Sequence, residues 1–192
     1  MKRMSPVILA GLFLVVGASV SVADDFRNST WGDSREAVRA AAGEPARPSN
    51  DELVYDVSLK GLNAVLLYTF TDGKLSGAVY FFREPHSNAS SYVIDYLALN
   101  DLLTEKYGKP QYDKDIWSNT RYEDDPFQWG TALALGHLSK QTIWETERTK
   151  ISHALLALND NINHMIQYSS QELESLSEEM EEMEKGKTLD QL

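Results

Sequence analysis

The chain of 192 residues contains no cysteine. Disulfide bonds and thiol nucleophiles are therefore excluded, and so is acylation at the cysteine of a lipobox. A chain of this length can bury a core without covalent cross-links. Exported domains of animals are usually rich in disulfides, because they fold in an oxidising compartment. If this chain is exported, its lack of cysteine favours a bacterial periplasm.

Long apolar runs are also scarce, and the main one covers residues 7–16. It is shorter than the ~20 residues that a membrane-spanning helix needs. Lys2 and Arg3 precede it, and small residues lead up to Ala23. This is the pattern of a signal peptide. We expect residues 1–23 to be cleaved near Ala23, which would leave a periplasmic or secreted protein. A retained membrane anchor is the alternative.

Motifs that specify a reaction are missing. The sequence has no Gly-x-Ser-x-Gly elbow, no phosphate-binding Gly-rich loop and no dinucleotide fingerprint after a strand. Its formal net charge of −11 repels phosphate backbones and therefore argues against nucleic acid as a partner. These absences favour a protein without a cofactor or catalytic residues. The alternative is a metal-dependent or other hydrolase whose site is built from scattered histidines and carboxylates.

Two groups of residues are candidate metal ligands. The four histidines are His86, His137, His153 and His164. None forms a helical pair, although the last three could converge from neighbouring strands on a zinc ion. The acidic residues between 113 and 125 could bind calcium, but their spacing differs from that of an EF-hand loop. We therefore assign no metal site.

Two helices are predicted, and both end in the same way. The first lies between residues 34 and 42, with Asp33 or Ser34 as the N-cap and Gly43 after its last turn. The second covers residues 89–107, where apolar and aromatic residues recur at helical spacing. Gly108 follows this helix as Gly43 follows the first.

The rest of the chain predicts strands. Residues 53–59 alternate between apolar and polar types, and Asp72-Gly73 is a typical two-residue hairpin turn. A turn is predicted at Ser139-Lys140 from its polar residues. The remaining predicted strands are 64–70, 75–83, 112–118, 129–138, 141–146, 151–158 and 162–168. The apolar residues 154–158 also suit a buried helical turn.

These patterns predict an α+β fold, an antiparallel sheet with two helices packed on one face. The folded domain covers residues 24–170. A tandem repeat of helix and meander would divide it into halves 24–86 and 87–170. Residues 171–192 are rich in glutamate, with apolar residues spaced three and four apart, and predict an acidic amphipathic helical tail.

Aromatic residues gather around the polar loop 119–128. They are Trp117, Tyr122, Phe127, Trp129 and Trp144. Exposed aromatic residues on a rigid scaffold are good binding anchors. Buried ones would instead form a core, and the sequence leaves both interpretations open. We take them as candidate binding residues.

Short motifs resemble known families. The segment 32–38, Gly-Asp-Ser-Arg-Glu-Ala-Val, resembles the helix start of the outer-membrane assembly lipoproteins of the SmpA/OmlA type. Together with segments 68–75 and 106–110, it also resembles uncharacterised exported bacterial proteins. The order of helix and meander is similar to that of the β-lactamase inhibitor proteins. This resemblance implies a binding module. The chain lacks the lipid-bearing cysteine of the lipoproteins.

We therefore expect a non-catalytic binding or scaffold protein of the bacterial envelope. Its partner would be another envelope protein. No stable membrane span would remain after cleavage of the signal peptide.

Overall fold

A computed structural model describes residues 24–47, 52–159 and 161–174. The predicted signal peptide lies outside the described residues. So does the predicted tail, apart from residues 171–174, which are helical. No helix of the described ranges is long and apolar enough to cross a membrane.

The described chain alternates between helices and groups of strands. The helices are α1 (Arg35–Ala42), α2 (Ala89–Tyr107), α3 (Trp129–Ala134) and the short 3₁₀ turns η1 (Thr120–Tyr122) and η2 (Pro126–Gln128). The strands are β1 (Leu53–Leu59), β2 (Leu62–Thr71), β3 (Lys74–Phe82), β4 (Tyr112–Trp117), β5 (Leu138–Glu145), β6 (Thr149–Leu158) and β7 (Asn161–Ser170).

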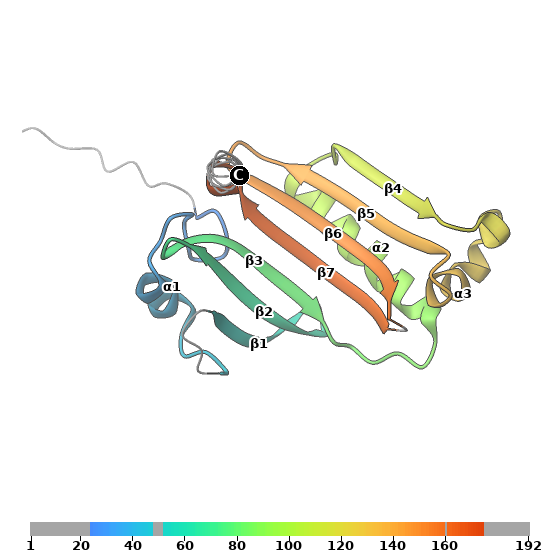
Figure 1. Cartoon of the computed structure of the whole chain (residues 1–192), viewed down its shortest axis with the longest axis horizontal. Coiled ribbons are helices and arrows are strands. Elements are labelled where there is room, and N and C mark those ends of the chain that lie inside the picture. The colour runs from blue at the N-terminus through green and yellow to red at the C-terminus, as the bar shows by residue number, and fades with distance from the viewer. Residues whose placement is uncertain (1–23, 48–51, 160, 175–192) are drawn as a thin grey trace, which may run out of the picture.

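All seven strands form one antiparallel sheet in the order β1-β2-β3-β7-β6-β5-β4 (Figure 1). Strand β7 comes last in the chain but lies in the middle, where it pairs with β3 and β6. The three strands after α1 and the four strands after α2 therefore share one continuous sheet. The predicted α+β class with an antiparallel sheet is confirmed.

The ends of both main helices follow from local chemistry. Ser34, not Asp33, is the N-cap of α1, and its hydroxyl accepts a hydrogen bond from the amide of Ala37 at 3.3 Å. The Asp33 carboxylate instead accepts from the amide of Thr30 at 2.8 Å. Gly43 and Gly108 end α1 and α2 with φ angles of 90° and 80°. Glycine enters this left-handed region without steric cost.

The hairpin between β2 and β3 turns at the predicted residues. Asp72 and Gly73 have φ angles of 50° and 74°. Positive φ at both central positions is the mark of a type I′ turn, whose twist matches that of the strands it joins. The prediction of this hairpin is confirmed.

Helix α2 packs on the inner face of the sheet, mainly over β5 and β6, while α1 lies near the β2–β3 hairpin (Figure 1). Tyr96, Leu99 and Leu103 of α2 are buried at the spacing that the sequence predicts. A cluster of buried apolar residues continues across the inner face of the sheet to β1, and Trp31 is part of this cluster. The Trp31 indole donates a hydrogen bond to the Thr149 hydroxyl at 2.8 Å, which ties the N-terminal segment to β6.

One predicted strand and one predicted turn are wrong. Residues 129–134 form helix α3, and Ser139-Lys140 lies inside β5. Gly130 lies against the start of α2, because a Cβ atom there would lie 2.4 Å from the amide nitrogen of Ser90. This close approach lets α3 pack on the start of α2. The apolar residues 154–158 belong to β6, so the interpretation as a helical turn is wrong.

Candidate functional site

Four of the five predicted aromatic residues lie at one end of the molecule, at the end of β4 and in the segment that follows it. Trp117 ends β4, Tyr122 lies in η1, Phe127 in η2, and Trp129 begins α3. We call this region the aromatic end. Trp144 does not join it, because β5 carries that side chain into the core, where it is fully buried and its indole donates to the carbonyl of Gly108 at 3.0 Å.

The aromatic end presents two partly buried ring pairs and one free ring. Trp117 and Trp129 meet edge to face, with ring centres 6.1 Å apart. Tyr122 stacks on His137 with ring centres 6.0 Å apart. Phe127 is 93% exposed. A phenylalanine in water forgoes the ~2 kcal/mol that its burial would contribute to the fold.

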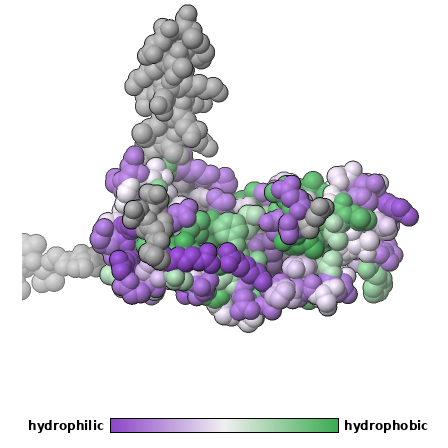
Figure 2. Space-filling view, turned by 60° about the horizontal axis from the view of Figure 1, so that its bottom comes forward, coloured by the Kyte–Doolittle hydropathy of each residue, from purple (hydrophilic) through white to green (hydrophobic). Residues whose placement is uncertain are grey.

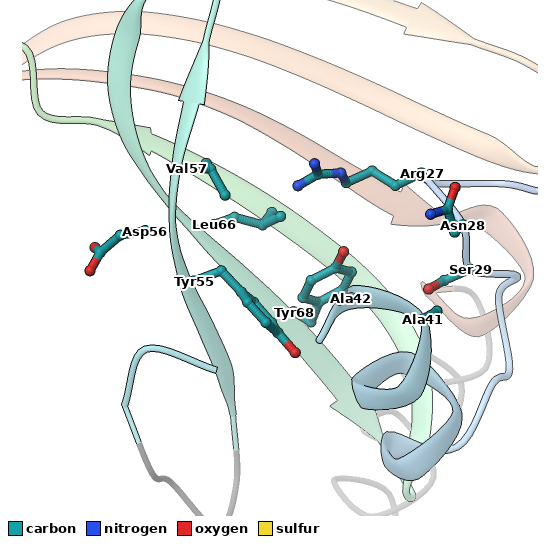
Figure 3. Close-up of a pocket in the computed structure, with 10 residues that line it drawn as sticks. All are labelled: Arg27, Asn28, Ser29, Ala41, Ala42, Tyr55, Asp56, Val57, Leu66 and Tyr68. Carbon is teal, nitrogen blue, oxygen red and sulfur yellow. The ribbon is translucent and has the colours of Figure 1, made fainter. Parts of the chain in front are cut away.

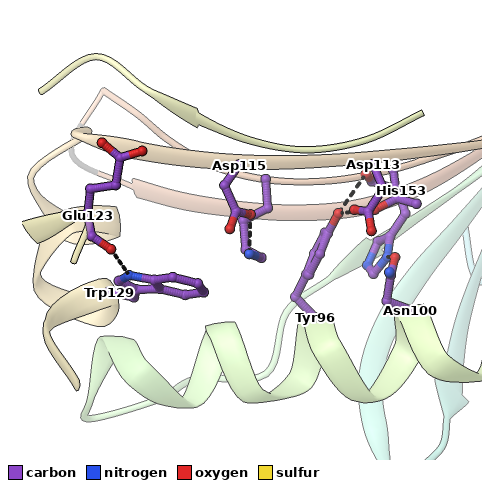
Figure 4. A network of polar contacts seen from close by, with 9 residues as sticks. Tyr96, Asn100, Asp113, Asp115, Glu123, Trp129 and His153 are labelled. Atoms are coloured by element: carbon purple, nitrogen blue, oxygen red, sulfur yellow. Dashed lines mark hydrogen bonds and ion pairs between the residues drawn. The ribbon is translucent and has the colours of Figure 1, made fainter. Parts of the chain in front are cut away.

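Hydrogen bonds from side chains fix the backbone that carries Phe127. Asn119 Oδ1 accepts from the amide of Arg121 at 3.0 Å, and Asp125 Oδ1 accepts from the amide of Phe127 at 3.1 Å. The Trp129 indole donates to the carbonyl of Glu123 at 3.2 Å (Figure 4). Each bond satisfies a backbone group that the 3₁₀ turns leave open. Phe127 is therefore displayed on an ordered turn.

A polar hollow of about 290 Å³ lies beside the aromatic end, between α2 and the edge of the sheet (Figure 4). It is lined by Tyr96, Leu97, Asn100, Asp113, Asp115, Trp129 and Lys140. The pairing of β4 with β5 creates it, since Asp113 lies opposite Thr142 and Asp115 lies opposite Lys140. Cross-strand partners of this kind point to the same face of a sheet.

Lys140 is the buried cation of this hollow, with only 6% exposure. Its ammonium group is paired with the Asp115 carboxylate. It also lies 4.7 Å from the ring centre of Trp129 and 5.7 Å from that of Tyr96. The negative faces of aromatic rings attract a cation, most strongly where water is excluded. Lys140 therefore joins the aromatic end to the polar hollow.

A chain of hydroxyl groups leads from the hollow into the interior. The Thr142 hydroxyl donates to Asp113 Oδ1 at 2.9 Å. The Tyr96 hydroxyl lies 2.7 Å from the same Thr142 oxygen and, because the Thr142 proton is already used, donates to it. Burial raises the pKa of Tyr96, which keeps this donor protonated.

Two neutral histidines close the inner end of the network. The His153 ring stacks on Tyr96 with centres 4.0 Å apart, and its Nδ1 lies 3.2 Å from Asn100 Oδ1. Its Nε2 lies 2.9 Å from Nε2 of His164. Burial lowers the pKa of both rings, that of His164 to about 4, because a charged imidazole is poorly solvated there.

The candidate metal ligands do not converge. His137 lies under Tyr122, apart from the pair of His153 and His164. Within the described part of the chain, no group of three or more histidine, aspartate or glutamate side chains is placed to bind a metal ion. Asp113 and Asp115 are engaged by Thr142 and Lys140 instead.

Sequence reasoning missed Lys140, Tyr96 and Asn100 as parts of one site. The alternation of Leu138, Lys140, Thr142 and Trp144 would have placed Lys140 on the inner face of a strand. A lysine at an inward position needs a partner, and Asp115 is the carboxylate that meets it across the strand pair.

Comparison of the chain with protein-family models, with curated proteins and with solved structures found no match in any of the three.

Proposed function

We propose that this protein is a non-catalytic binding protein of the bacterial envelope and that its aromatic end takes a protein partner. The exposure of Phe127 on an ordered turn carries the proposal. Interfaces draw most of their affinity from a few large side chains that become desolvated. A rigid turn lowers the entropy that is lost on binding.

The surroundings of Phe127 support a specific docking surface. Leu97 and Leu135 are exposed apolar side chains in this region, with 45% and 56% exposure. In the space-filling view, hydrophobic and hydrophilic side chains lie side by side at the α3 end (Figure 2). The acidic residues 123–125 border Phe127 in the sequence. The partner that fits is a protein with an apolar pocket and a basic rim.

Site-specific cross-linking in intact cells tests this surface. A photo-reactive phenylalanine analogue replaces Phe127 in one strain and Phe81 in a matched strain. Phe81 lies on β3 and is 38% exposed. We expect a discrete covalent adduct from position 127 and none from position 81. An absence of adducts from position 127, or the same adducts from both positions, would contradict the proposal.

Export of the chain is a separate part of the proposal and has its own test. It rests on the basic, apolar and small residues that end at Ala23. Fractionation of cells followed by N-terminal sequencing should recover a chain that begins at Asp24. A cytoplasmic chain that begins at Met1 would contradict export without affecting the docking surface.

A further inference from the structure

An apolar groove runs between α2 and strands β1–β3, on the part of the inner face that α2 leaves open. Its inner part is a hollow of about 210 Å³ whose apolar lining includes Leu59, Tyr80 and Ile166. An outer hollow of about 390 Å³ adjoins it. Leu99 and Leu102 line both hollows, which makes them neighbouring parts of one groove. Seen from the β1 side, hydrophobic surface lies between hydrophilic side chains (Figure 2).

The charges of the inner hollow have one sign. Arg27 and Lys106 line it, and no carboxylate does. Among the residues that the structure describes, neither Arg27 nor Lys106 takes part in an ion pair, although the whole chain has a formal net charge of −11. The Lys106 ammonium group lies 4.9 Å from the ring centre of Tyr107, a contact that does not neutralise its charge. Two cations without a carboxylate partner beside an apolar hollow are complementary to an anion with an apolar tail.

Arg27 is held over the groove by a tight turn. The amide of Ser29 donates to the carbonyl of Phe26 at 3.0 Å, and the amide of Phe26 donates to the carbonyl of Ser29 at 3.1 Å. The Phe26 ring packs between Tyr68, Tyr80 and other aromatic rings of the core. The turn is therefore anchored on both sides of Arg27.

The conformation of Arg27 is unfavourable for its residue type. Its φ angle of 54° lies in the left-handed region, which an arginine seldom occupies. Such strain often marks residues that hold a ligand.

The Arg27 side chain reaches from the turn toward Val57 and Leu66, across a third hollow of about 330 Å³ (Figure 3). Burial raises the pKa of the Tyr68 hydroxyl to about 12, and nearby Arg27 partly opposes this shift.

We propose that this groove binds a free long-chain carboxylate. The alkyl chain lies along Leu99 and Leu102, and the carboxylate pairs with Arg27 and Lys106. The outer hollow favours this orientation, because three carboxylates line it, those of Asp95, Asp101 and Glu105, against the single cation Lys60. Its net negative charge repels the carboxylate of the ligand. The headgroup therefore faces Arg27. This site is separate from the aromatic end, and the inference does not depend on the proposed function.

Calorimetric titration of the full chain with dodecanoate, below micelle-forming concentrations, tests the proposal. We expect saturable binding to one site, and weaker binding of dodecan-1-ol, which has the same chain without the charge. The double variant Arg27→Glu, Lys106→Glu should weaken dodecanoate binding by about tenfold or more, as expected when two ion pairs become repulsive. A matched double variant, Lys74→Glu, Lys114→Glu, changes net charge equally and should bind as the wild type does.

A second variant tests the apolar part of the groove. Leu102→Gln should weaken dodecanoate and dodecan-1-ol alike, because both need the apolar wall. Circular dichroism and urea unfolding establish that each variant is folded.

Several outcomes would overturn the inference. They are an absence of dodecanoate binding, equal weakening by the two charge-reversal pairs, and binding to vesicles of phosphatidylglycerol without binding to free dodecanoate. The cross-linking result at Phe127 does not bear on any of them, so the two proposals fail separately.

Discussion

The Nε2 atoms of His153 and His164 lie 2.9 Å apart in the buried layer between α2 and the sheet. Only one proton can occupy this contact. Asn100 Oδ1 can only accept, so the proton on His153 Nδ1 is donated to Asn100 and His153 Nε2 is left as an acceptor. His164 Nε2 is therefore the donor of the pair, and both rings are neutral.

This pair predicts that acid destabilises the fold. A histidine in the unfolded chain has a pKa near 6.5, and burial lowers the folded pKa of His164 to about 4. The unfolded chain therefore binds more protons below pH ~6.5, and the free energy of unfolding falls as the pH drops toward ~4. We expect a loss of about 3 kcal/mol from His164 over this window.

Urea unfolding at a series of pH values measures this loss. In His164→Gln the amide can still donate to His153, but one titrating group is removed. The free energy of unfolding of this variant should fall less steeply with acid than that of the wild type. Equal slopes for this variant and the wild type would contradict the prediction.

The ion pair of Lys140 and Asp115 in the polar hollow predicts that removing the carboxylate costs more stability than removing the ammonium group. Asp115→Ala leaves the ammonium of Lys140 buried without a carboxylate, and we expect a loss of about 2 kcal/mol in the free energy of unfolding. Lys140→Met removes the buried charge and keeps most of the packing on Trp129, so its cost should stay below about 1 kcal/mol.

Thermal unfolding of both variants and of the double variant separates the two effects. Lys140→Met should rescue most of the stability lost in Asp115→Ala. If the two losses simply add, the buried charge is not their cause.

The contact of α3 with α2 predicts a severe effect of one added methyl group. Gly130→Ala would place a Cβ atom 2.4 Å from the amide nitrogen of Ser90, so one helix has to move. We expect a loss of about 3 kcal/mol, the upper range for overpacking. Gly61→Ala is the control, because Gly61 has open space and only its φ of 84° is unfavourable to alanine. The free energy of unfolding of Gly61→Ala should fall by about 1 kcal/mol. Chemical denaturation measures both variants, and equal losses for Gly130→Ala and Gly61→Ala would argue against the clash.

The strained turn predicts that Arg27 can be replaced with a gain in stability. Arg27→Gly relieves the left-handed conformation and should raise the free energy of unfolding by about 1 kcal/mol. Asn159→Gly, at a φ of 51°, should gain less, because asparagine tolerates this region. Differential scanning calorimetry compares the two variants. A gain at Arg27 together with weaker dodecanoate binding would show that the strain serves the ligand, whereas a loss of stability would show that the arginine supports the fold.

Much of the first half of the chain could be predicted from the sequence. The Asp72-Gly73 turn, the alternation in β1 and the glycines after both helices act through a few neighbouring residues. Positive φ at Gly43 and Gly108 is a property of the residue type, and tertiary contacts are not needed to explain it.

The candidate site depended on contacts between distant residues. Lys140 has the polarity of a turn residue, yet β5 carries it inward because Asp115, 25 residues earlier, neutralises it. Trp144 has the same chemistry as the exposed aromatic residues but occupies an inward position on β5. Residue type alone cannot show which of these side chains is buried and which is exposed, because burial depends on strand register.

The sequence by itself determined the α+β class, the glycine ends of both main helices, the Asp72-Gly73 turn and the inner face of α2. Each of these depends on propensity, periodicity or backbone geometry within a few residues. Only the tertiary structure decided that one sheet joins all seven strands and that α3 is a helix. It also exposed Phe127 and left a groove beneath Arg27. The physical reason is that burial and the pairing of charges follow from which segments pack together, and this information is spread over the whole chain.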